Sequence, residues 1–264
     1  MPAPRPPALI AEDLRVRIGH VEVVNNLNLV IRPGQLFGVL GPNGVGKTTL
    51  LETLAGLRLP QRGGITLGGD RMDSLDRREI ARRLGMLMQH TSYAFEATCL
   101  QTALVGRHPH IKPWSRESRR DRNLARQALD DVHILELAQR SCMDLSGGES
   151  RRLALATLLV QDPQIMLLDE PTNHLDPANQ VTILNVIDRQ VREHHKCAVM
   201  ALHEVNLASC YCSHVLLLYG DGEWEAGPSR ALLTADNLSR LYHCRVRLID
   251  DGRQRVFAVA GQRS

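Results

Sequence analysis

The stretch from Gly41 to Thr49 constrains this chain more than any other, because it reads Gly-Pro-Asn-Gly-Val-Gly-Lys-Thr-Thr. It fits the pattern G-x-x-x-x-G-K-[ST], a phosphate-binding loop between a strand and a helix. The apolar run from Leu36 to Leu40 precedes it, and the helix-like segment from Thr48 to Ala55 follows it. The required strand, loop and helix are therefore present. This context disfavours the alternative, a Gly-rich turn that binds nothing.

The residue types in the loop suit a polyphosphate. Glycines let successive backbone N–H groups turn toward one centre, and the start of a helix adds the positive end of its dipole. Lys47 would reach the β- and γ-phosphates, and Thr48 would place its hydroxyl on Mg²⁺. The predicted nucleotide-binding residues of the loop are Gly41, Pro42, Asn43, Gly44, Val45, Gly46, Lys47, Thr48 and Thr49.

The composition is typical of a globular protein of ordinary surface charge. The chain has 264 residues, of which 43% are hydrophobic, enough to bury a sizeable core. Its 32 basic and 29 acidic residues leave a net charge of +3, which gives no argument for nucleic acid as a partner. The six cysteines form no C-x₂-C pair, so we expect neither a disulfide framework nor a cysteine metal site.

No segment of the chain is typical of membrane insertion or secretion. No run approaches the ~18 apolar residues of a membrane span. The N-terminus is Pro-rich and lacks the apolar core of a signal peptide. We therefore expect a cytoplasmic protein that reaches any membrane through a partner.

Hydrophobic patterning predicts an α/β fold. Alternating segments from Leu9 to Ile31 flank a turn at residues 19–20 and predict an antiparallel β layer ahead of the phosphate loop. Apolar positions at helical spacing predict a helical insert over about 90–160, in which the charged cluster 116–122 forms a solvated face. Three apolar runs then predict buried parallel strands, with a helix over 181–192 between the first two. These runs are 165–168, 198–202 and 215–218.

Two carboxylates follow the first of these runs. Asp169 and Glu170 emerge at the carboxyl end of a predicted buried strand, the edge at which active-site groups collect in parallel sheets. Asp169 can hold Mg²⁺ beside Thr48, while Glu170 can polarise an attacking water. An acidic pair at a helix N-terminus is the alternative, and the phosphate loop makes the catalytic interpretation the stronger one.

Two further polar side chains end apolar strands. His203 follows the run 198–202 and would reach the same edge as Glu170, where it could contact the γ-phosphate or orient the water. Gln89 follows the apolar run 84–88. A lone histidine is usually structural, so its place at a strand end carries the functional prediction.

A second Gly-rich helix start lies over Leu145–Glu149, which reads Leu-Ser-Gly-Gly-Glu before the helical segment 151–160. It predicts a second phosphate site in a chain that already has a phosphate loop. With that loop, it resembles the signature of the ATP-binding cassette family. In that family, the signature contacts the γ-phosphate of ATP held by a second subunit. The residues concerned are Leu145, Ser146, Gly147, Gly148 and Glu149.

The resemblance covers roughly residues 9–242, with the motifs in the family's order. It implies a P-loop NTPase core of cassette type with an N-terminal antiparallel β subdomain and an inserted helical subdomain. It implies Lys47, Gln89, Glu170 and His203 as catalytic residues. Three residues are implied as Mg²⁺ ligands: Thr48, Gln89 and Asp169. Residues 173–176 resemble the D-loop, with Asp176 as its carboxylate.

One position departs from the family pattern. Members carry an aromatic residue in the first hairpin that stacks on adenine, and Ile18 stands at the corresponding place. Aliphatic contact replaces only part of that stacking, so we expect ATP binding with weaker discrimination against GTP.

The resemblance also implies an assembly. ATP is sandwiched between two cassettes in the family, which implies a homodimer. The single cassette and the segment 104–110 resemble the importer branch for cobalamin, ferric siderophores and haem. This branch implies integral membrane permease subunits, a periplasmic substrate-binding protein acting through them, and a peripheral place at the cytoplasmic face of the inner membrane. We expect an ATPase domain over 8–245 and a tail over 246–264.

Two other functions stay open from the sequence. One is a soluble cassette ATPase that acts on ribosomes or iron–sulfur assembly. The other is the ATPase of an exporter. The pair His108 and His110 suggests a metal site, but it lacks a third ligand, and a loop beside the permease is the better interpretation.

Overall fold

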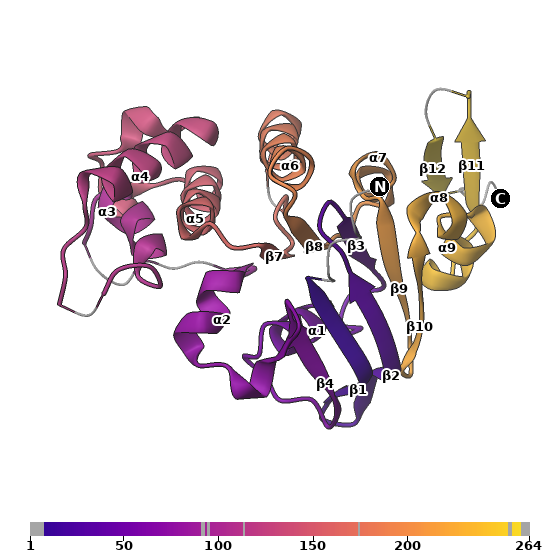
Figure 1. Ribbon diagram of the computed structural model, residues 1–264. Coiled ribbons are helices and arrows are strands. Elements are labelled where there is room, and N and C mark those ends of the chain that lie inside the picture. Colours follow the sequence, from indigo (N-terminus) through magenta and orange to yellow (C-terminus); the bar gives the residue numbers. More distant parts are fainter. Residues whose placement is uncertain are drawn as a thin grey trace, which may run out of the picture.

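A six-stranded sheet forms the centre of the molecule, in the order β10-β9-β3-β8-β7-β6 (Figure 1). The computed structural model describes residues 8–90, 93, 96–112, 114–173, 175–252 and 255–259. All neighbouring strands of this sheet are parallel except β9 and β10. The strands are β3 (Leu36–Leu40), β6 (Leu84–Leu87), β7 (Ile165–Asp169), β8 (Cys197–Ala201), β9 (His214–Gly220) and β10 (Glu223–Pro228). This confirms the predicted α/β fold class.

The inner strands are buried on both faces, which explains why they are continuous apolar runs. Every residue of β3, β7 and β8 is buried. Along β7, Met166 and Leu168 face one hydrophobic cluster, while Ile165 and Leu167 face the other. Successive side chains of a strand point to opposite faces. The sheet therefore separates two cores.

The predicted antiparallel layer is a second sheet, in the order β2-β1-β4-β5. Helix α1 (Lys47–Leu54) packs against strands of both sheets and so lies between them. The phosphate loop is thereby built into the core. The strands are β1 (Leu9–Ile18), β2 (Val21–Ile31), β4 (Arg62–Leu67) and β5 (Asp70–Arg71).

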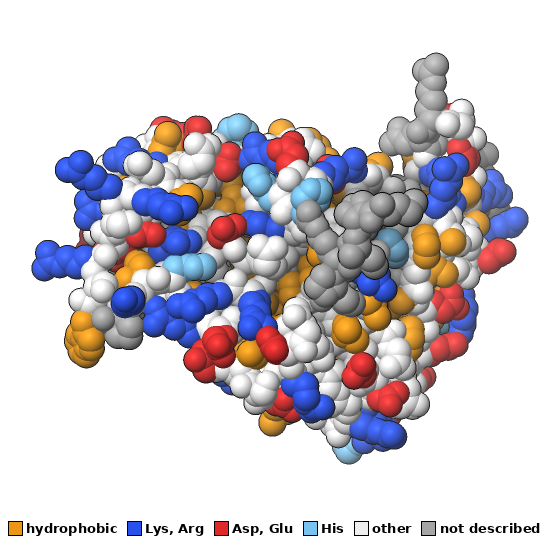
Figure 2. All heavy atoms as spheres, viewed as in Figure 1, with side chains coloured by type: hydrophobic (Ala, Val, Ile, Leu, Met, Phe, Trp, Pro, Cys, Tyr) orange, Lys and Arg blue, Asp and Glu red, His pale blue; other side chains and the backbone are white. Residues whose placement is uncertain are grey.

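The predicted helical insert contains α3 (Cys99–Leu104), α4 (Arg119–Asp131) and α5 (Gly147–Gln161). Each begins with a reciprocal capping box between the N-cap side chain and the third helical residue. Short 3-10 turns join these helices: η2 (Val105–Arg107), η3 (Leu135–Leu137) and η4 (Cys142–Asp144). In Figure 2, Lys and Arg side chains gather over this part at the left edge. The predicted solvated face over 116–122 is exposed at 116–120 and 122. Asp121 is the exception: it is buried and pairs with Arg107 at 2.9 Å, so that part of the prediction was wrong.

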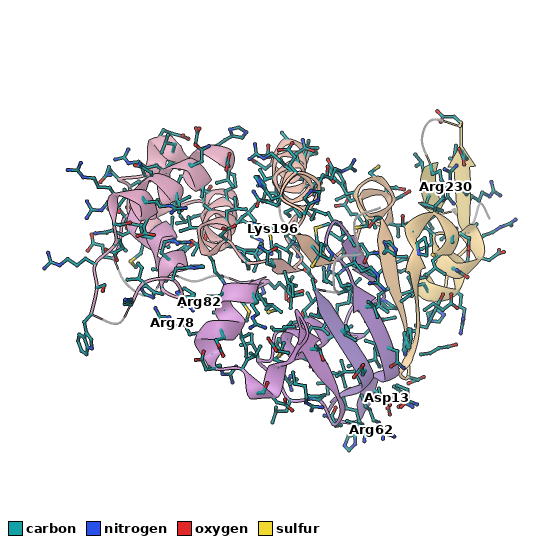
Figure 3. The ribbon with its side chains drawn as sticks, viewed as in Figure 1. Asp13, Arg62, Arg78, Arg82, Lys196 and Arg230 are labelled. Atoms are coloured by element: carbon teal, nitrogen blue, oxygen red, sulfur yellow. The ribbon has the colours of Figure 1, made fainter. Side chains whose placement is uncertain are left out.

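Helix α2 (Arg77–Arg83) attaches the insert to the sheets. Arg78 and Arg82 donate from α2 to carbonyls of the loop after η2: Arg78 to Pro109 and Ile111, and Arg82 to Pro109 at 2.7 Å (Figure 3). Gln161, at the end of α5, donates to the carbonyls of Ala81 and Leu84 at 2.7 and 3.0 Å. The insert is thus anchored along α2.

The remaining helices cover the face of the sheet opposite α1, and the tail closes the chain beside them. These helices are α6 (Pro177–Arg192), α7 (Val205–Tyr211), α8 (Ser229–Leu232) and α9 (Ala235–Tyr242). A short 3-10 turn, η1 (Met72–Ser74), precedes α2 elsewhere in the fold. The tail holds two antiparallel strands, β11 (Val246–Asp250) and β12 (Arg255–Val259). Asn206 of α7 bonds the backbone of Phe257 in both directions, at 2.8 and 3.2 Å. Within the described residues, no helix is both long and apolar enough to cross a membrane.

Gly106 tests the packing of the insert. A Cβ there would meet the carbonyl oxygen of Thr157 at 2.2 Å and the backbone nitrogen of Gln161 at 2.9 Å, both on α5. We expect Gly106→Ala to lower the free energy of unfolding by about 1–3 kcal/mol, because the α5 backbone cannot yield as a side chain can. Gly64→Ala is the control, since its Cβ would meet nothing closer than 3.7 Å. Urea unfolding compares the two, and equal midpoints would contradict the packing described.

Candidate nucleotide site

The phosphate loop joins β3 to α1 in a conformation that needs glycine. Gly44 and Gly46 have φ of 78° and 106°, in the left-handed region that side chains disfavour. A Cβ at Gly46 would also lie 2.5 Å from Cγ2 of Val23. Gly46 is the N-cap of α1 and offers no side-chain cap, so the first N–H groups of the helix stay available to a ligand.

Lys47 is held at the rim of this loop. Its side chain is buried, and Nζ donates to the carbonyls of Gly41 at 2.8 Å and Pro42 at 3.2 Å. Burial lowers the pKa of Lys47, and the nearby charges of Glu170 and Asp169 oppose that shift. A cation thus lies between the loop and the two carboxylates, where phosphate oxygens would need it.

Asp169, the last residue of β7, is a buried carboxylate that is 1% exposed. Within the described residues, neither of its two oxygens accepts a hydrogen bond within normal distance and angle limits. Burial raises the pKa of Asp169, although the facing hydroxyl of Thr48 works in the opposite direction. Buried polar atoms are normally paired, so this one signals a missing ligand. Carboxylate and hydroxyl oxygens suit Mg²⁺, so Asp169 and Thr48 fit that ion.

Glu170 is the opposite case, a carboxylate with three donors. Oε2 accepts from Nε2 of Gln89 at 2.9 Å and from Nδ2 of Asn173 at 2.7 Å, and Oε1 pairs with Nε2 of His203. Burial alone would raise the pKa of Glu170, but these partners hold it below its ordinary value. Glu170 also has a φ of 49°, a strained conformation of the kind found at functional sites. The side chain is therefore an ionised base in a fixed orientation.

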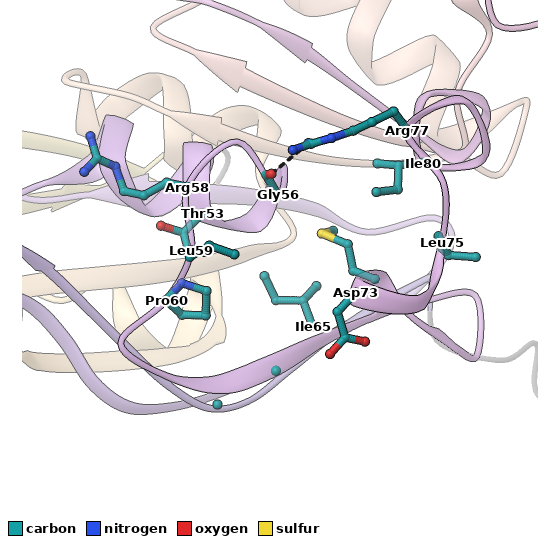
Figure 4. Close-up of a pocket in the computed structure, with 13 residues that line it drawn as sticks. Thr53, Gly56, Arg58, Leu59, Pro60, Ile65, Asp73, Leu75, Arg77 and Ile80 are labelled. Atoms are coloured by element: carbon teal, nitrogen blue, oxygen red, sulfur yellow. Dashed lines mark hydrogen bonds between the residues drawn. The ribbon is translucent and has the colours of Figure 1, made fainter.

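A small cavity lies beside Glu170. It has a volume of about 120 Å³, enough for a few waters, and its lining includes Glu170, Asn173, His203 and Glu204. A larger cavity of about 430 Å³, drawn in Figure 4, lies elsewhere, between the end of α1, β4 and α2. There Arg77 donates to the carbonyl of Gly56 at 3.0 Å, and the cavity shares no residue with the carboxylate edge.

The structure thus brings Lys47, Gln89, Asp169, Glu170 and His203 to one edge of the sheet. We did not predict Asn173 as a member of this group. Its backbone N–H bonds the carbonyl of Glu170 at 3.2 Å, so a turn after β7 returns its amide to the carboxylate. The turn-forming residues after Glu170 were the available signal.

The signature residues lie apart from this group. Ser146 Oγ accepts from the N–H of Glu149, and Glu149 Oε2 accepts from the N–H of Ser146 at 2.7 Å, which caps α5. A Cβ at Gly147 would meet nothing within 4 Å. Among the described residues, no hydrogen bond or ion pair joins segment 145–149 to segment 41–49. The signature is therefore an open helix start, free for contact with something outside this chain.

Asp176 and Ile18, two other predicted site residues, lie at the ends of regular elements. Asp176 caps α6 and accepts from the N–H and side chain of Asn179 at 2.9 and 2.7 Å. Ile18 ends β1 and is 38% exposed. The neighbouring D-loop residue His174 lies outside the described residues.

Asp169 provides a test of the Mg²⁺ fit. We expect Asp169→Asn without ligand to melt at no lower temperature than the original protein. The substitution removes the cost of burying a charge, so the ligand-free fold loses nothing. The further stabilisation that Mg²⁺ gives with ATP should disappear. For a ligand about 100-fold above its Kd this stabilisation is about 2.7 kcal/mol, or about 5–10 °C.

Melting curves with ATP plus EDTA and ATP plus MgCl₂ measure this difference. Asp73→Asn is the control, because Asp73 is exposed on η1 and should keep the magnesium-dependent shift. An Asp169→Asn protein that still responds fully to magnesium would exclude Asp169 as a ligand.

Comparison with known proteins places these features in a family. A family model described as ABC transporter matches residues 24–173, more than half of the chain. The ferric enterobactin transport ATP-binding protein of Escherichia coli (strain K12) is 34% identical over 243 residues, which cover 92% of this chain and 90% of that protein.

Two solved structures agree. An inward-facing transporter described as metal-chelate type has a TM-score of 0.84 at 28% identity, covering 97% of this chain and 99% of that chain. A dimeric ATP-binding cassette in a post-hydrolysis state, bound to ADP and phosphate, has a TM-score of 0.73 at 25% identity, covering 84% and 99%. The chain therefore belongs to the ATP-binding cassette transporter family, as an ATP-binding and ATP-hydrolysing subunit.

Proposed function

We propose that this chain powers an importer of metal chelates such as cobalamin, ferric siderophores or haem. In this proposal it works as a homodimer on integral membrane permease subunits, at the cytoplasmic face of the inner membrane. A periplasmic binding protein delivers the substrate to the permease. The ferric enterobactin relative and the metal-chelate type structure support the substrate class. The hydrolytic role rests on one observation, the ionised Glu170 that three donors hold beside the buried Asp169.

The proposed reaction uses these residues in fixed roles. The loop and Lys47 hold the phosphates of ATP. Thr48 and Asp169 would hold Mg²⁺, which would neutralise negative charge on the phosphates of ATP. Glu170 takes a proton from the attacking water, and the oxygen of that water bonds to the γ-phosphorus. The bond between the γ-phosphorus and the oxygen of the leaving ADP breaks in the same step. His203 and Gln89 orient Glu170 and the phosphate.

The dimer follows from the open signature. The exposed helix start at Ser146 and Gly147 can offer N–H groups to the γ-phosphate of ATP on a second copy. Each site is then completed by the partner's helix. The dimeric cassette bound to ADP and phosphate supports this arrangement.

The permease contact is proposed near Gln89. Met88 precedes Gln89 in the chain and is a large apolar side chain that stays 43% exposed. Exposed apolar groups beside polar ones favour a protein interface. A permease loop seated there would touch the segment that carries Gln89, and its movement would reach Glu170 through the Gln89 hydrogen bond.

Replacing Glu170 tests hydrolysis. Glu170→Gln should keep ATP binding but lower kcat by about 10²–10⁴-fold, the usual loss of a general base. Glu204→Gln is the control, since this carboxylate lines the same small cavity but is exposed. Calorimetry measures binding and phosphate release measures turnover. Unchanged hydrolysis in Glu170→Gln would rule out its assignment as the base.

The transport role has its own test. The chain should co-purify with a membrane permease, and its ATPase rate in that complex should rise severalfold when a binding protein loaded with corrinoid, siderophore or haem is added. A chain that cosediments with ribosomes and finds no permease would favour the soluble alternative. Stimulation by a substrate presented from the cytoplasmic side would favour an exporter.

A further inference from the structure

Arg151 is the buried cation of α5, and the proposed mechanism does not yet use it. It lies two residues after the signature and is 7% exposed. Its guanidinium carries five N–H donors, and in the described part of the chain it makes five hydrogen bonds to backbone carbonyls. Those acceptors are Met88, Gln89 at 3.2 Å, Asp169, Glu170 at 2.8 Å and Pro171 at 3.3 Å.

These carbonyls belong to two separate segments. Met88 and Gln89 follow β6, and residues 169–171 end and follow β7. Met88 and Gln89 lie beyond the end of β6, and Glu170 and Pro171 lie beyond the end of β7, where the strand ladder no longer supplies donors regularly. The same segments carry the side chains of Gln89 and Glu170, which bond each other at 2.9 Å. One guanidinium therefore fixes the backbone under both.

The burial of the Arg151 charge is costly, because no ion pair joins it to a carboxylate in the part of the chain that the structure describes. Burial lowers its pKa, and the charges of Asp169 and Glu170 oppose that shift. A buried charge is retained only when its surroundings match it closely. The planar fork of Arg supplies that match, and the single nitrogen of Lys cannot span both segments.

The attachment of Arg151 to α5 connects two halves of the proposed site. Its helix starts with Ser146 to Glu149, the residues offered to the nucleotide of a second copy. We propose that Arg151 is a positioning residue: it fixes the orientation of α5 relative to Glu170 and Gln89, so that engagement of the signature aligns the base. This inference rests on the proposed ATPase function.

The other end of α5 has its own attachment, because Gln161 donates to the carbonyls of Ala81 and Leu84. Arg78 and Arg82 of α2 hold the loop after η2 separately. A variant that loses Arg151 therefore keeps the insert anchored to the sheets. We expect such a variant to misalign Gln89 and Glu170 while the nucleotide-binding loop 41–49 stays intact.

Arg152 offers a matched control on the next position of the same helix. It donates to the carbonyl of His133 at 2.9 Å, inside the helical part, and among the described residues no hydrogen bond or ion pair joins it to β6 or β7. Arg151→Lys and Arg151→Met should each lower kcat by about tenfold or more while Kd for ATP stays within about threefold. Arg152→Lys and Arg152→Met should keep kcat within about threefold of the original chain.

The outcomes separate clearly. Wild-type kcat in Arg151→Lys, equal losses in the Arg152 variants, or a loss of ATP binding in parallel with kcat would each overturn the proposal. If Arg151→Met does not fold, Arg151→Lys decides; if neither folds, Arg151 serves the fold and the proposal fails. A chain that hydrolyses no ATP even as wild type would instead contradict the proposed function.

Discussion

Two adjacent carboxylates at the end of β7, Asp169 and Glu170, have opposite environments and opposite pKa shifts, and the site depends on that difference. Burial raises the pKa of Asp169, and the hydroxyl of Thr48 faces it, so the pair fits a cation. Glu170 turns away through a left-handed backbone conformation and gains three donors, so its pKa is lowered. Two like charges on neighbouring residues are tolerable because one awaits a metal and the other is hydrogen-bonded. A single strand end thus supplies an ion ligand and a base.

The surrounding fold serves to fix this edge. The parallel strands β6, β7 and β8 bring Gln89, Glu170 and His203 together, and α1 sets the phosphate loop against the same edge from between the two sheets. Helix α5 reaches the edge through Arg151 and presents the signature at its exposed start. A nucleotide held by the loop lacks those signature N–H groups in a single chain. The half-built site is the physical reason to propose a second copy.

Sequence reasoning succeeded where chemistry follows from local pattern. Apolar runs predicted the buried strands, and the strand ends predicted Asp169, Glu170, Gln89 and His203 as neighbours. It missed Asn173, because that contact depends on how a turn folds back. It also missed Arg151, since no spacing rule says that a helical arginine passes beneath two strand ends. The roles of Ile18 and of the signature remain predictions, because each needs a bound nucleotide or a second chain.

The central claim is that this chain provides half of a composite ATP site. Sedimentation velocity of the Glu170→Gln chain tests it most directly, because slow hydrolysis would preserve the ATP-bound state. With MgATP, the 29.4 kDa chain should move as a species of about twice that mass. It should remain a monomer without magnesium, or when Ser146→Arg blocks the signature. A Glu170→Gln chain that binds MgATP to saturation and stays monomeric would contradict the account.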